Sequence, residues 1–113
     1  MKKEDISTPS VLIDLDAMER NIDMMASLCR EHGKDLRCHF KVFKTPYIAH
    51  EVLRRGAVGM ACAKVGEAEV MAAAGIRNIM IANEVVGKDK IERMIMVAKQ
   101  VDELIAAVDN IEN

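Results

Sequence analysis

The segment DLRCHFKVFKTPYIAHEVLRRGAVGMACA, residues 35–63, predicts a strand, a helix and a second strand in immediate succession. Residues 35–42 are rich in β-formers and end near a lysine. Thr45 and Pro46 then mark a helix start, since a proline at the first helical position loses no hydrogen bond. Residues 58–63 (VGMACA) form a short apolar run. This order predicts a βαβ unit with parallel strands, in which the helix buries a face made of Ile48, Ala49, Val52 and Leu53.

The same alternation continues on both sides of this unit. Further strand signals cover residues 10–15 (SVLIDL), 78–83 (NIMIAN) and 103–109 (ELIAAVD). Further helix signals cover residues 16–32, with Asp16 as the expected N-cap, residues 66–74 and residues 88–100. The strands are nearly continuously apolar, which is expected when helices cover a parallel sheet. The sequence therefore predicts an α/β fold of about five strands and four helices.

The number of units sets the expected architecture. A closed (β/α)₈ barrel needs eight strands and typically about 250 residues. The last predicted strand ends at Asp109 with no helix signal behind it, which would leave a sheet edge open. We therefore expect residues 1–113 to form a single domain. It is either a fragment holding the first part of a barrel, a sheet completed by association of copies into a homo-oligomer, or an open α/β sheet.

Composition and charge exclude several functional classes. The net charge is −2 and no basic cluster is longer than two residues, which argues against nucleic-acid binding. No run of 18 apolar residues occurs, so we expect no membrane span, and the polar N-terminus lacks the apolar core of a signal peptide. Cys29, Cys38 and Cys62 show no metal-ligand spacing. We expect reduced thiols, no metal site and a cytoplasmic location.

The chemistry of the sequence centres on Lys41. On a strand, Arg37, His39 and Lys41 would share one face, and parallel α/β folds place active sites at the carboxyl ends of their strands. A lysine is useful there when its amine is neutral and nucleophilic, and neighbouring cations favour the neutral form by lowering the lysine pKa. The same positive groups would suit the phosphate of an anionic cofactor. The alternative is that Lys41 and Lys44 mark the solvated end of a strand, and the pattern alone does not separate the two.

Three segments together carry a family resemblance: TPSVLIDLDAMERNI (8–22), RCHFKVFK (37–44) and GAVGMACAKVGEAEVMAAAGIRNIMIANEVVG (56–87). They resemble the N-terminal half of the D-threonine aldolase / D-serine dehydratase family, which are pyridoxal-phosphate enzymes of the alanine-racemase-like barrel class (fold type III). The first lysine of that family's R-P-H-x-K-T-H-K motif forms a Schiff base with the cofactor, and it aligns with Lys41. The family's GEAEVMAAAG aligns with residues 66–75, and its I-A-N-Q-V-V-G aligns with residues 81–87 apart from Glu84.

The sequence departs from the family pattern beside this lysine. Cys38 replaces the motif proline, Val42 the threonine and Phe43 the second histidine. The family's later strands, phosphate-binding glycine loops, metal ligands and C-terminal β-domain have no counterpart in these 113 residues.

The resemblance implies a pyridoxal-phosphate-dependent lyase acting on β-hydroxy D-amino acids, of the D-threonine aldolase or D-serine dehydratase type. It implies that Lys41 is catalytic and binds the cofactor, with His39 and Arg37 as further cofactor-binding residues. The resemblance leaves a divalent metal possible in the full-length family, but the ligands for it are absent here. The alternative is a non-catalytic barrel fragment or assembly unit that retains the lysine without using it, so whether this chain is itself an enzyme stays open.

Overall fold

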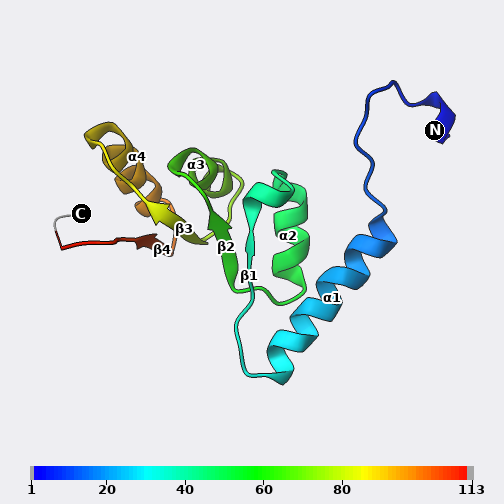
Figure 1. Ribbon diagram of the computed structural model, residues 1–113, viewed down its shortest axis with the longest axis horizontal. Coiled ribbons are helices and arrows are strands. Elements are labelled where there is room, and N and C mark those ends of the chain that lie inside the picture. The colour runs from blue at the N-terminus through cyan, green and yellow to red at the C-terminus, as the bar shows by residue number, and fades with distance from the viewer. Residues whose placement is uncertain (1, 112–113) are drawn as a thin grey trace.

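In the computed structural model, which describes residues 2–111, four strands form one parallel sheet in the order β1-β2-β3-β4 (Figure 1). The strands are β1 (Arg37–His39), β2 (Gly59–Cys62), β3 (Asn78–Glu84) and β4 (Glu103–Ala107). The α-helices are α1 (Leu15–Glu31), α2 (Pro46–Arg54), α3 (Val65–Ala73) and α4 (Lys88–Ala98), with short 3₁₀ turns η1 (Lys3–Asp5) and η2 (Phe40–Val42). The predicted α/β class and parallel sheet are confirmed.

Each strand pairs in parallel with the next strand in sequence, and a helix makes each connection. Because such crossovers are right-handed, consecutive helices lie on the same side of the sheet. Figure 1 shows α2, α3 and α4 following one another along that side. The core lies between these helices and the sheet; its fully buried side chains include Met60, Cys62, Ile79 and Ile81 from the strands and Met71, Ile76 and Val97 from the connecting segments.

Local sequence signals place the helix ends. Pro46 occupies the start of α2, as predicted. Gly56 and Gly75 follow α2 and α3 with φ angles of 105° and 85°, a backbone region open to glycine and strained for other residues. These glycines turn the chain back into β2 and β3.

The prediction of a strand at residues 10–15 is wrong. Residues 10–14 have no strand partner in the described part of the chain, and Val11 is 94% exposed. A β-rich run forms a strand only where a neighbouring strand satisfies its backbone groups. The helix that follows starts earlier than expected, because Asp14 is its N-cap instead of Asp16: the Asp14 carboxylate accepts a hydrogen bond from the Ala17 N–H at 2.9 Å.

Strand β1 is shorter than predicted. It ends at His39, and the chain then turns through η2, because the Phe40 ring is drawn into the core, where it is 3% exposed. Lys41 is therefore presented by a 3₁₀ turn and not by a strand. The last strand is also shorter than predicted, since it ends at Ala107.

Helix α1 packs against the β1–α2 edge of the sheet. Met18 and Ile22 contact the apolar cluster of Ile48, Val52 and Ala57. Arg55, at the end of α2, links that helix to α1 through ion pairs to Glu19 (3.0 Å) and Asp23 (3.2 Å). Within residues 2–111, none of the helices combines the length and apolarity that crossing a bilayer requires.

Candidate functional site

Lys41 lies at the centre of turn η2, just beyond the carboxyl end of β1. The turn is closed by two hydrogen bonds to the Phe40 carbonyl, from the N–H of Phe43 at 3.2 Å and the N–H of Lys44 at 2.9 Å. The side chain of Lys41 is exposed, and it forms no ion pair with any residue from 2 to 111. An accessible amine is thus held at the carboxyl ends of the strands, where parallel α/β folds bind ligands.

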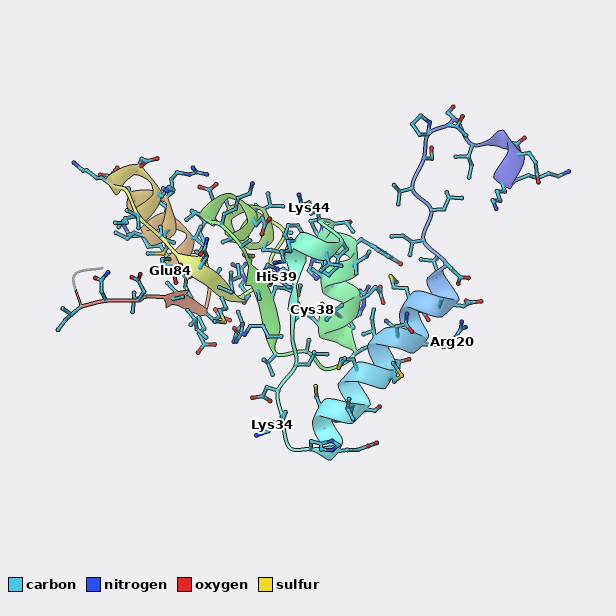
Figure 2. All side chains as sticks on the ribbon, viewed as in Figure 1. Arg20, Lys34, Cys38, His39, Lys44 and Glu84 are labelled. Atoms are coloured by element: carbon cyan, nitrogen blue, oxygen red, sulfur yellow. The ribbon has the colours of Figure 1, made fainter. Side chains whose placement is uncertain are left out.

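His39 is the residue that starts this turn. Its Nδ1 atom accepts a hydrogen bond from the backbone N–H of Lys41 at 3.3 Å. A neutral imidazole that accepts at Nδ1 carries its proton at Nε2, so the other ring nitrogen is a donor. Figure 2 shows His39 and Cys38 along β1, with Lys44 just beyond the end of the strand. The contact between the two residues is made by the His39 side chain and the Lys41 backbone, whereas the sequence predicted side chains sharing one strand face.

Arg37 lies at the opposite, amino edge of the sheet. Its Nη1 donates to Asn78 Oδ1 at 2.5 Å, and its Nη2 lies 3.7 Å from Glu103 Oε2. Asn78 in turn donates from Nδ2 to the same Glu103 oxygen at 2.6 Å. These groups belong to the first residues of β1, β3 and β4, and none of the contacts reaches Lys41.

Sequence reasoning missed Asn78 and Glu103 as partners of Arg37. The signal present in the sequence was that each of three strands begins with a polar residue. Seeing the contact also required the strand register, which pairs Arg37 with Gly59 and Asn78 with Glu103. Gly59 leaves the space through which the arginine passes, because a Cβ there would collide with the Arg37 guanidinium.

A cavity of about 420 Å³ opens beside η2, between the turn and the first turn of α3. It is lined by Phe40, Lys44, Lys64, Gly66, Glu67 and Val70. Within the described chain neither lysine is ion-paired, whereas the buried Glu67 carboxylate accepts a hydrogen bond from the Ala63 N–H at 2.7 Å. Together with Lys41 these lysines make the carboxyl edge beside β1 and β2 positively charged.

The thiols near the site are poor nucleophiles. Burial raises the pKa of Cys62 to about 12, and the charge of Glu67 adds to the increase. Burial also raises the pKa of Cys38, against a smaller opposing effect of a hydrogen bond with the His39 backbone. Both thiols stay protonated at neutral pH and are therefore weak nucleophiles. Between residues 2 and 111, no three His, Cys, Asp or Glu side chains are grouped closely enough to hold a metal ion.

Comparison with known proteins identifies relatives of this arrangement. The 3-hydroxy-D-aspartate aldolase of Paracoccus denitrificans is 36% identical over 114 residues, which cover 100% of this chain and 30% of that protein. The D-threonine aldolase of Arthrobacter sp. is 41% identical over 108 residues, which cover 96% of this chain and 28% of that protein.

Solved structures show the same fold. The D-threonine aldolase from Filomicrobium marinum superposes with a TM-score of 0.94 at 44% identity, covering 97% of this chain and 30% of that one. The D-threo-3-hydroxyaspartate dehydratase from Delftia sp. HT23 superposes with a TM-score of 0.87 at 30% identity, covering 96% and 28%. The resemblance inferred from the sequence is confirmed.

The chain spans less than a third of the length of these relatives. Its four parallel strands, connected by helices, correspond to the first part of their barrel, as predicted. The family model described as "Alanine racemase, N-terminal domain" matches residues 13–113. This chain belongs to the alanine racemase N-terminal domain family.

Proposed function

We propose that Lys41 holds pyridoxal phosphate covalently through its amine and that the chain serves a lyase acting on β-hydroxy D-amino acids. The observation that carries this proposal is the placement of Lys41: an accessible amine without an ion pair among residues 2–111, at the carboxyl edge of the sheet. The lysine also matches the cofactor-binding lysine of the family motif. The proposal includes the domain: residues 1–113 act as one part of an alanine-racemase-like barrel.

The residues around Lys41 fit an anionic aldehyde cofactor. Lys44 and Lys64 lack ion pairs within residues 2–111 and line the cavity beside the turn, so their charge favours a phosphate or carboxylate group nearby. His39 keeps its Nε2 proton available for donation. Arg37 fits less well, because its guanidinium is bound to Asn78 and Glu103 at the other edge of the sheet. We infer that Arg37 aligns the strands.

Pyridoxal phosphate, when bound, supplies an electron sink that stabilises negative charge left on a substrate carbon after bond cleavage. The chain's own contribution follows from its geometry. Lys41 positions the cofactor and, once displaced by the substrate amine, can accept or donate a proton at Nζ. The positive edge attracts the carboxylate of the amino acid.

The reaction we propose is retro-aldol cleavage of a β-hydroxy D-amino acid. Two relatives are named for it, as aldolases of 3-hydroxy-D-aspartate and of D-threonine. Dehydration is the second reaction in this proposal, supported by the relative named D-threo-3-hydroxyaspartate dehydratase. D-Serine dehydration stays a prediction of the motif resemblance.

A non-catalytic assembly unit is the competing function, and the apolar surface favours it. A groove of about 450 Å³ runs between α1 and the β1–α2 edge. Its lining is apolar apart from two residues and includes Met18, Ile22, Leu36, Phe43 and Val52. Such a surface would suit association, whereas it gives Lys41 no role.

Cofactor addition separates the two functions. We expect pyridoxal phosphate to produce a near-visible absorbance band that borohydride abolishes as it fixes the adduct. Lys41→Ala should lose the band, and the matched variant Lys34→Ala, at an exposed lysine that precedes β1, should keep it. If Lys41→Ala binds the cofactor as well as the unaltered protein, the assignment of Lys41 is wrong.

A further inference from the structure

Two aromatic rings clamp the turn that carries Lys41. The rings of Phe40 and Phe43 meet edge to face, with centroids 5.7 Å apart and an interplanar angle of 86°. Residues three apart in a 3₁₀ turn lie nearly above one another, so both rings point into the protein. The two residues between them, Lys41 and Val42, are exposed, and Val42 is 79% exposed.

The two rings reach different parts of the core. Phe40 is 3% exposed and belongs to the large cluster formed by the sheet, α3 and α4. Phe43 packs against that cluster and also against the smaller cluster of Ile48, Val52 and Ala57. Phe43 therefore links the turn to both halves of the core, whereas the family motif has a histidine at this position.

The backbone of the turn depends on this anchoring. The N–H groups of Phe43 and Lys44 both donate to the Phe40 carbonyl, so a shift of either ring moves the segment that contains Lys41. Short 3₁₀ turns have poor hydrogen-bond geometry and little stability of their own. Side-chain packing must therefore supply most of what holds η2 in one conformation.

We propose that Phe43 is a positioning residue, whose ring fixes η2 so that the amine of Lys41 points from the sheet edge in a reactive orientation. This inference rests on the proposed function of Lys41. In the step that it assists, Nζ forms a bond to the aldehyde carbon of the cofactor, and the aldehyde oxygen leaves as water with the two amine protons. Phe43 touches none of these atoms and acts only through the turn.

The test compares Phe43→Leu and Phe43→His with Val42→Thr, a control that restores the family residue at the neighbouring exposed position. Two quantities are measured in each folded variant: the initial rate at which pyridoxal phosphate is trapped on Lys41 by borohydride, and the hydrogen-exchange rate of the Lys44 amide. We expect Phe43→Leu to slow trapping about tenfold, since misplacement by 1 Å can cost on the order of 10²-fold. Lys44 amide exchange should accelerate, and Val42→Thr should match the unaltered protein in both measurements.

Three outcomes would overturn the inference. One is a Phe43→Leu variant that melts at a lower temperature yet traps the cofactor at the unaltered rate per folded molecule, which would make the role of Phe43 purely structural. Another is an equal loss in Val42→Thr. If Phe43→Leu does not fold, Phe43→His replaces it under the same criteria. The third is unchanged Lys44 amide exchange in the Phe43 variants, which refutes the positioning role whether or not the cofactor is trapped. Absence of trapping in the unaltered protein is a separate result, and it refutes the proposed function.

Discussion

The backbone N–H of Lys41 donates to Nδ1 of His39, so the histidine two residues earlier caps the turn that presents the lysine. This relationship assigns His39 a structural role that the sequence alone did not suggest. It also fixes the neutral ring as the tautomer protonated at Nε2. His39 can therefore hold the turn through one nitrogen and offer a proton from the other.

Replacing His39 tests this capping role. We expect His39→Ala to lower the free energy of unfolding by about 1 kcal/mol, the usual cost of losing an N-cap acceptor. His39→Asn, whose side-chain oxygen can accept the same N–H, should retain most of that stability. Urea unfolding followed by circular dichroism measures both. Equal losses in the two variants would mean that the Nδ1 hydrogen bond does not stabilise the turn.

The crossing of Arg37 over Gly59 gives a second prediction. A Cβ at Gly59 would lie 2.5 Å from the Asn78 backbone oxygen and would also meet the Arg37 guanidinium. Gly59→Ala should therefore destabilise the sheet by about 1–3 kcal/mol through overpacking. Gly66→Ala is the control, since its nearest neighbouring atom is at 3.6 Å and alanine favours the helix. Thermal unfolding compares the two variants. If Gly66→Ala unfolded at a lower temperature than Gly59→Ala, the crowding of Arg37 and Asn78 around Gly59 would be contradicted.

Lys44 has a left-handed backbone, with φ of 50°, and it is the only residue other than glycine with a positive φ between positions 2 and 111. This conformation costs an L-residue about 1–2 kcal/mol and costs glycine little. We expect Lys44→Gly to keep or raise stability by up to about 1 kcal/mol, and Lys44→Val to lower it. Lys90, an exposed residue inside helix α4, provides the control, because Lys90→Gly should only destabilise. The urea concentrations at which the three variants are half unfolded test whether the left-handed backbone at Lys44 carries this cost.

Glu51 makes stability depend on pH. Hydrogen bonds from Arg54 and Arg55 hold the Glu51 pKa below its usual value of 4.5. A carboxylate whose folded pKa is depressed contributes stability that is complete above about pH 4.5 and lost as pH falls through the folded pKa. Glu51→Gln should therefore be less stable than the unaltered protein at pH 7, and the difference should shrink toward pH 3.

A matched variant isolates this ion-pair effect. Glu31 forms no ion pair within residues 2–111, so Glu31→Gln should show no comparable pH-dependent difference. Urea unfolding at several pH values compares both variants. A Glu51→Gln deficit that is the same at pH 3 and pH 7 would exclude the charge of Glu51 as its cause.

Local patterns predicted much of the fold. Pro46 marks a helix start by backbone chemistry that needs no tertiary context, and the structure confirms it. Gly56 and Gly75 follow the ends of α2 and α3 for a similarly local reason, their positive φ angles. The β-rich run at residues 10–15 failed because strand formation depends on a neighbour that local sequence does not specify. Propensity alone therefore located the βαβ units correctly and misassigned the segment without a partner.

In the candidate site, too, some features follow from local sequence and others depend on contacts between distant segments. Lys41 was found because a family motif marks it, and its exposure at the carboxyl edge follows from the strand that precedes it. The expected grouping of Arg37 with Lys41 assumed side-chain alternation through residue 41. The Phe40 ring ends that alternation by turning into the core. The contact of Arg37 with Asn78 depends on strand register across 41 residues and was not predictable from local pattern.

Mapping the site of cofactor attachment decides whether Lys41 is the residue that holds pyridoxal phosphate. The protein is incubated with pyridoxal phosphate, reduced with borohydride and digested, and the modified lysine is located by tandem mass spectrometry. We expect the pyridoxyl group on Lys41 at stoichiometric yield, with only traces on Lys44 and Lys64. Labelling spread evenly over the three lysines, or concentrated on a residue other than Lys41, would contradict it.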